Sequence, residues 1–168
     1  LSLDLTPLDK ATDNVEQTPN FRTPFLDLDQ LYGGGPNLSP FLYRNKQEYR
    51  GAERFLIGKT TGPNSSEDDL PRNAEGIALT GDPRQDENLI LAQLHVAFLK
   101  LHNLVVARRK DLDAYRRKGD SDFVAAQRLV RWHYQWIVCH DYLKAILDPN
   151  VFAELAKLEE AKLEEARR

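Results

Sequence analysis

The chain has 168 residues, of which 41% are apolar and 29% charged, a composition typical of a globular domain with a sizeable core. The formal net charge of -3 argues against nucleic acid as the main partner. We expect neither a membrane span nor a signal peptide, because no apolar run looks long enough and the first residues lack a basic segment. The cellular location stays open. The single cysteine, Cys139, excludes an internal disulfide framework.

Residues 1–85 are predicted to be mostly irregular, since most of the proline and glycine residues lie there. So long a loop region in a compact domain usually has a function or supports a ligand. Two short elements are expected within it, a helical turn near Asp29 to Tyr32 and an extended piece at Arg54 to Lys59.

Two long helices are expected next. The first covers about Asp86 to Lys110, and its apolar face repeats at helical spacing: Leu91, Leu94, Phe98, Leu101 and Val105. The second covers about Ser121 to Leu147, with Ser121 as the N-cap. It is apolar almost all round, so we expect it to be central. It should end at Asp148, because a residue before proline disfavours helical backbone.

A third helix is expected from Asn150, as N-cap, to the C-terminus. Residues 148–168 consist largely of strong helix formers and look idealised, so we hypothesise an engineered or computationally generated segment. The fold prediction is therefore mainly α, with three long helices packed as a bundle and a long irregular N-terminal region. We expect one domain, 1–168, made of the loop region 1–85, core helices 86–147 and the idealised helix 148–168.

The segment from Asp82 to Asn88 places an arginine three residues before a glutamate at the start of a helix. Four further blocks follow a fixed order with it: Thr18 to Gly33, Leu70 to Asn73, Leu94 to Asn103 and Arg128 to Leu143. Together these blocks resemble the animal-type haem peroxidases over roughly residues 15–147, although each block alone would be a weak signal.

The resemblance implies a role for two residues of this motif. Arg84 would polarise bound hydrogen peroxide, because a guanidinium stays charged at any working pH and stabilises developing negative charge. Glu87 would bond covalently to the edge of the haem, with Arg84 beside it. The implied reaction is oxidation of a small reducing substrate by hydrogen peroxide. The alternative interpretation is that these charged residues only decorate a helix N-terminus, where acids are favoured.

The resemblance also implies a calcium loop. Its ligands would be the Thr23 hydroxyl, the Phe25 carbonyl and the carboxylates of Asp27 and Asp29, which are the hard oxygen ligands that calcium prefers. The alternative is that the two aspartates cap a turn and a helix start.

Two histidines that the family uses are expected to be missing. Its distal histidine precedes the calcium loop, and its proximal, iron-ligating histidine follows the block that ends at Leu143. The four histidines here lie between these positions: His95, His102, His133 and His140. We therefore expect structural histidines on core helices and a central fragment of the family domain, with impaired or absent turnover.

Three hypotheses stay open at this point. The first is a haem peroxidase-like domain. The second is a catalytically silent helical scaffold, designed or truncated, that binds no haem. The third is a calcium-binding or interaction module. A fragment of a larger helical domain would expose apolar surface, so a homo-oligomer is also conceivable.

Overall fold

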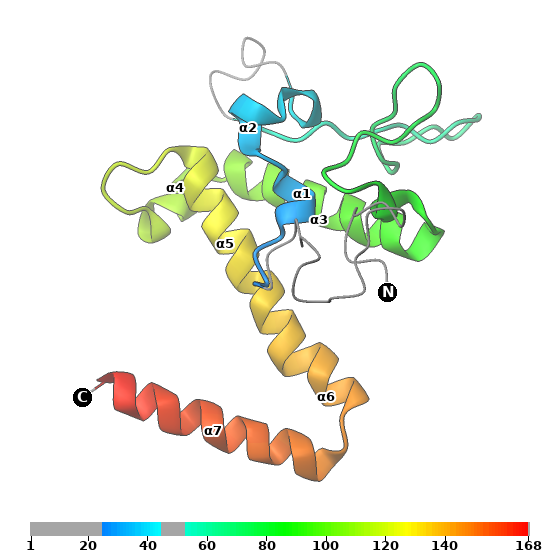
Figure 1. Ribbon diagram of the computed structural model, residues 1–168. Helices are drawn as coiled ribbons and strands as arrows, with labels where there is room; N and C mark the ends of the chain where they lie inside the picture. Colours follow the sequence, from blue (N-terminus) through cyan, green and yellow to red (C-terminus); the bar gives the residue numbers. More distant parts are fainter. Residues whose placement is uncertain (1–24, 45–52, 168) are drawn as a thin grey trace, which may run out of the picture. The chain divides into compact units, whose positions relative to one another are not determined.

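The computed structural model describes residues 25–44 and 53–167 (Figure 1). Contacts group the chain into two compact units, Leu1–Val130 and Arg131–Arg168, and each is described by itself. The described residues are mainly helical, and their only extended pairings are isolated bridges, so the predicted mainly α class is confirmed. The expectation of a single domain stays a prediction.

The first unit is organised around α3, Leu89–Ala107. Its N-cap is Asn88, whose side chain accepts a hydrogen bond of 3.0 Å from the Leu91 amide. The helix ends at Arg108, which leaves helical backbone. The expected helix from Asp86 to Lys110 was therefore too long. Its first residues belong to a separate 3-10 turn, η4, Pro83–Asp86, and its last residues to α4, Arg109–Leu112.

The predicted apolar face of this helix is buried only in part, since Phe98, Leu101 and Val105 are half-buried. Leu91 and Leu94 are exposed, the latter by 54%. The buried positions are shifted around the helix and include two histidines: Ala92, His95, Val96, Leu99, His102 and Val106. Because α3 is apolar on nearly every side, periodicity alone does not select the buried side. The buried side is the one that carries His95 and His102, which form hydrogen bonds with residues outside the helix.

Asn103 and His102 anchor an irregular segment on α3. The Asn103 carboxamide accepts a 2.7 Å hydrogen bond from the Phe55 amide and donates a 3.0 Å bond to the Phe55 carbonyl. His102 Nε2 lies 3.2 Å from the Glu53 carbonyl, so this nitrogen carries the proton. Nδ1 must then accept the 3.2 Å hydrogen bond from the Tyr32 hydroxyl. These contacts replace the strand pairing that the segment otherwise lacks.

An aromatic cluster closes around the His102 ring. Its members are Tyr32, Tyr43, Phe55 and Phe123. The ring centroids of their contacting pairs lie 4.7–5.9 Å apart, and both tyrosines meet Phe123 edge to face. The Tyr43 hydroxyl donates a 2.8 Å hydrogen bond to the Tyr32 carbonyl. Burial lowers the pKa of His102 to about 4, so the ring is neutral near pH 7.

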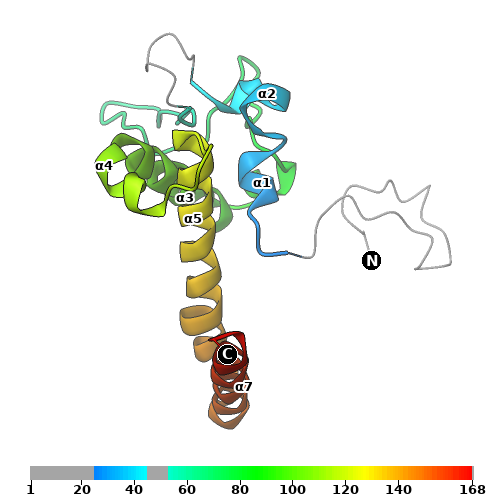
Figure 2. The same ribbon diagram turned by 90° about the vertical axis from the view of Figure 1, so that its left-hand side faces the viewer.

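Residues 29–42 form three short helices, the first of which contacts α3. The expected helical turn is α1, Asp29–Tyr32, which rests against α3 in both views (Figures 1 and 2). α2, Gly35–Leu38, and η3, Pro40–Leu42, follow it. The expected extended piece at Arg54 to Lys59 contains two isolated bridges, Tyr43 with Phe55 and Gly58 with Asp69.

A second core lies where α3 ends. Val106 packs there with Leu112 of α4 and with Ala125 and Ala126 at the start of α5, Asp122–Trp136. Figure 2 shows α4 and the first turns of α5 beside α3. η5, Asp113–Tyr115, lies between α4 and α5 in the chain. Ser121 accepts a 3.2 Å hydrogen bond from the Val124 amide, which confirms it as the N-cap of α5.

The second unit begins inside α5. The expected continuous helix to Leu147 changes to a π-helix, η6, Ile137–Tyr142, and then to α6, Leu143–Ile146. This part is not apolar core: Trp136 is 55% exposed, and Ile146 is also exposed. α7 covers Pro149–Arg167, and the Asn150 amide donates to Asp148, so Asp148 rather than Asn150 caps it. The expectation of a homo-oligomer stays a prediction.

By length and composition, α3 could also cross a membrane, contrary to our expectation for the sequence. Such a helix is weak evidence, since a core helix has the same character. His95 and His102 on its buried face bond to other parts of the first unit, which favours the core interpretation.

We expect Asn103→Ala to lower the free energy of unfolding by about 1–3 kcal/mol, because the buried Phe55 amide loses its acceptor. Urea denaturation of the full chain measures this. Asn64→Ala, in an exposed turn, is the matched control and should change stability by less than about 0.5 kcal/mol. Equal effects of the two substitutions would contradict the anchoring role of Asn103.

Acid should destabilise the first unit through its buried histidines. Burial lowers the pKa of both His95 and His102 to about 4, below their ordinary 6.5. The unfolded chain therefore binds protons more tightly, and stability present above pH 6.5 is lost as the pH falls toward 4. The loss is on the order of 3 kcal/mol for each histidine.

Melting temperatures between pH 8 and 4 test this loss. His102→Gln should flatten the profile in that window, whereas Asn64→Ala, at an exposed position without a titratable group, should leave the profile as it is. A wild-type profile that is level down to pH 4 would refute the assignment of neutral core histidines.

Candidate active site

The predicted arginine and glutamate lie on one turn, η4, directly before α3. Pro83 occupies its first position, where a fixed φ and a missing N–H suit a helix start. Asp82, in extended backbone, is the N-cap, and its Oδ1 accepts a 3.0 Å hydrogen bond from the Arg84 amide. The local sequence Asp-Pro thus accounts for where the turn begins.

Arg84 is bound by the same aspartate through its side chain. Its Nε lies 3.1 Å from Asp82 Oδ1, and its Nη2 lies 2.7 Å from Oδ2. The Asp82 side chain is 1% exposed, whereas that of Arg84 is 46% exposed. The ion pair is therefore a two-pronged, charge-assisted contact with a buried anchor and a guanidinium that still reaches the surface.

Glu87 follows Arg84 by three residues and is exposed. Its amide donates a 3.3 Å hydrogen bond to the Arg84 carbonyl, which holds the two residues on the same turn. Within the described part of the chain, nothing donates to the Glu87 carboxylate. The structure thus places Arg84 and Glu87 on one turn.

Asp86, between these two residues, is used differently. Arg72 donates to its two carboxylate oxygens over 2.7 and 2.8 Å, and this lowers the pKa of Asp86. Arg72 also bonds Asp69, 3.2 Å from its Nε. The pair ties η4 to the loop at 69–72, so the turn is held from a second side.

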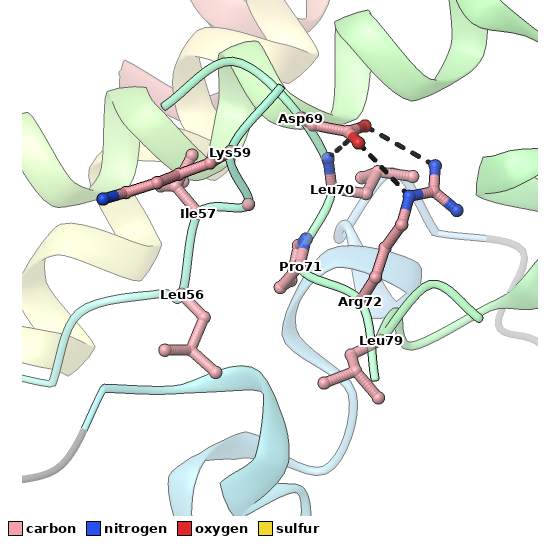
Figure 3. A pocket seen from close by; sticks show the side chains of 9 residues that line it. Leu56, Ile57, Lys59, Asp69, Leu70, Pro71, Arg72 and Leu79 are labelled. Carbon is pink, nitrogen blue, oxygen red and sulfur yellow. Dashed lines mark hydrogen bonds and ion pairs between the residues drawn. The ribbon is translucent and has the colours of Figure 1, made fainter. Parts of the chain in front are cut away.

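That loop borders a cavity of about 330 Å³, seen in Figure 3. Asp69 and Arg72 point toward each other at its edge, and Leu56 and Leu79 line it. A second cavity, of about 900 Å³, lies in the second unit between η6, α6 and α7. Neither of these two cavities is lined by Arg84 or Glu87.

The predicted calcium ligands are described in part. Thr23 lies outside the described residues. The side chain of Phe25 is 74% exposed, which leaves only its carbonyl as a possible ligand. Asp27 and Asp29 are half-buried, and Asp27 Oδ1 accepts a 3.3 Å hydrogen bond from the Asp29 amide, as in the capping interpretation. Among the described residues there is no group of three or more His, Cys, Asp or Glu side chains that could hold a metal.

Leu28, between these aspartates, has left-handed backbone with φ of 60°. It is the only non-glycine residue with positive φ in the described part of the chain, and its side chain is buried. Such a conformation costs on the order of 1 kcal/mol or more and is common at ligand sites. The fold retains it because Leu28 begins α1 and packs inward.

The two predicted sites approach each other at Gly81. A Cβ on this residue would lie 2.5 Å from the Gln30 carbonyl oxygen and 3.3 Å from the Gly33 amide. Only glycine allows this close approach to α1. The residue before Asp82 therefore rests on the helix that directly follows Asp27 and Asp29.

In the first unit, the described residues fit one part of the haem that the resemblance implies and do not fit another. Arg84 and Glu87 suit a haem edge, since one is a fixed cation and the other an exposed carboxylate. The described histidines of this unit do not suit the iron. Both ring nitrogens of His102 are bonded, and His95 is buried with its Nδ1 3.2 Å from Gln85 Oε1. The described residues of this unit thus fit the haem edge and supply no axial ligand.

Sequence reasoning gave no role to three residues of this region. Asp82 holds Arg84, Gln85 bonds His95, and Arg72 binds Asp86. Only the first had a local signal, an aspartate two residues before an arginine and directly before proline. The other two contacts join segments that sequence reasoning could not place side by side.

Comparison with known proteins identifies the family. The family model for animal haem peroxidase matches residues 5–166, which include most of α7. Human thyroid peroxidase (Homo sapiens) is 30% identical over 159 residues, covering 86% of this chain and 17% of the relative. The dog protein (Canis lupus familiaris) is 28% identical, covering 84% and 16%. The chain spans about one sixth of the length of these relatives. A designed origin for α7 stays a hypothesis. The ordered motifs around Arg84 and the match over nearly all residues show that the chain belongs to the animal haem peroxidase family.

Proposed function

We propose that this chain supplies the arginine side of a haem peroxidase site that oxidises a small reducing substrate with hydrogen peroxide. Arg84 would polarise the peroxide, and Glu87 would bond to the haem edge. The observation that carries the proposal is the Arg84 guanidinium, fixed by a buried carboxylate on the same turn as the exposed Glu87.

The chemistry asked of Arg84 is electrostatic. As the O–O bond of peroxide breaks, negative charge develops on the departing oxygen, and a prepositioned cation stabilises it without reorganisation. Arg84 has the required fixed direction, because Asp82 holds its Nε and Nη2. Haem, when bound, supplies the oxidising chemistry.

Turnover by these 168 residues alone is expected to be low. All four histidines follow Arg84 in sequence, and the two in the first unit are core residues. A histidine that moves the peroxide proton typically contributes ~10²–10⁴-fold in rate. This observation favours the second candidate function, a helical scaffold of the same family with little or no activity.

A haem titration of the full chain separates the two candidates. The peroxidase proposal predicts a shifted Soret band and peroxide-dependent dye oxidation above the rate of free haemin. Arg84→Gln should lower that rate by roughly 10²-fold or to the free-haemin level. Arg44→Gln is the matched control. Arg44 Nη2 lies 3.3 Å from Glu67 Oε2, and neither residue belongs to η4. No spectral change on adding haem would reject the proposal and leave the scaffold.

Glu87 has its own signature, a haem that stays attached after denaturation. We expect wild-type chain treated with haem and peroxide to retain haem on a denaturing gel, and Glu87→Gln to lose it. Glu75→Gln, at another exposed glutamate, should retain haem. Equal retention by all three proteins would show that Glu87 does not form the bond.

We also propose calcium binding by the Thr23 hydroxyl, the Phe25 carbonyl and the Asp27 and Asp29 carboxylates. Support comes from the strained Leu28 backbone between the two aspartates and from the oxygen-rich ligand set. Ligand that binds only the folded chain would stabilise it by mass action.

Calcium added to chain stripped with EDTA should raise the melting temperature, with a gain of about 2–3 kcal/mol at a hundredfold excess over Kd. Asp27→Asn and Asp29→Asn should each remove most of the shift, and the exposed Asp111→Asn should not. Calorimetry with no heat of binding and an unchanged melting temperature would disprove a calcium site.

A further inference from the structure

Asp82 does more than cap a turn. An N-cap needs one acceptor, and Asn or Ser provides one as well as Asp does. Here the second carboxylate oxygen and the full charge are directed at the Arg84 side chain, with Nη2 2.7 Å from Oδ2. Burying a carboxylate to 1% exposure is costly unless it is paired, and the ion pair with Arg84 offsets part of that cost.

The backbone at Asp82 is fixed on both sides. Gly81 rests against the Gln30 carbonyl of α1, too close for any side chain. Thr80 Oγ1 donates a 2.8 Å hydrogen bond to the Asp82 carbonyl, and Pro83 restricts the backbone of Asp82, the residue before it, to extended conformations. A carboxylate with so little freedom fixes the direction of the cation it binds.

We propose that Asp82 is the positioning residue of Arg84: its buried carboxylate aims the guanidinium so that the exposed part faces the peroxide ligand. The inference rests on the proposed function of Arg84. Asp82 also neutralises the charge of Arg84 in part. The pair therefore presents a hydrogen-bond donor of fixed direction. Its net positive charge is smaller than that of an unpaired arginine, so it attracts anions less strongly.

The Nε–H signal of Arg84 in the ¹⁵N NMR spectrum of the chain without haem tests this directly. Wild-type Arg84 Nε–H, whose acceptor Asp82 is buried, should exchange with water at least about tenfold more slowly than Arg116 Nε–H, whose acceptor Asp113 is exposed. This comparison needs no variant, so a misfolded mutant cannot obscure it. Equal, fast exchange at both arginines would overturn the proposal.

Asp82→Asn separates positioning from capping. Asparagine still accepts from the Arg84 amide, so the turn should persist, while the charge that holds the guanidinium is lost. We expect Arg84 Nε–H exchange to approach that of Arg116 Nε–H. Asp113→Asn, the control at the exposed pair, should leave the Arg84 signal unchanged. Slow exchange retained in Asp82→Asn would reject the role of the carboxylate.

The haem-loaded chain provides a second measurement. A positioning role predicts that Asp82→Asn lowers kcat for peroxide turnover as Arg84→Gln does, with little change in haem affinity. Failure of the haem titration in wild type would reject the proposed function and leave the NMR result standing. Fast wild-type exchange would reject the positioning role even where haem binds.

Discussion

A long stretch of irregular backbone can be stable only when its amides and carbonyls find partners, and α3 provides them. Asn103 bonds both polar groups of Phe55, and His102 bonds the Glu53 carbonyl. These polar side chains lie on the buried face of an otherwise apolar helix. A buried polar group without a partner is costly, so each contact stabilises the loop and the helix together.

The candidate site depends on the same helix. η4 precedes α3 directly, Nδ1 of His95 in α3 lies 3.2 Å from Gln85 Oε1, and Arg72 binds Asp86. The turn that carries Arg84 and Glu87 is therefore held at three places: the helix cap at Asn88, the histidine contact and the Arg72 ion pair. Within that frame, Asp82 sets the direction of Arg84, and Gly81 sets the position of Asp82 against α1.

The placement of histidines explains why family membership and activity are separate questions here. His95 and His102 are neutral core residues, and their ring nitrogens serve loop contacts. They stabilise the part of the fold that presents the arginine. The same burial makes them poor candidates for iron ligation or proton transfer within the first unit.

The sequence by itself determined the helical class, the helical turn at α1, the cap at Ser121 and the motif that joins Arg84 to Glu87. These features are set by local capping chemistry, helix periodicity or residue order. Only the tertiary structure decided which face of α3 is buried. Leucines occur on several sides of this helix, and the buried side is the one whose histidines form hydrogen bonds with other segments. The tertiary structure also decided the pairing of Asp82 with Arg84 and the approach of Gly81 to α1. Such contacts depend on through-space packing between segments, which no periodicity in the chain encodes.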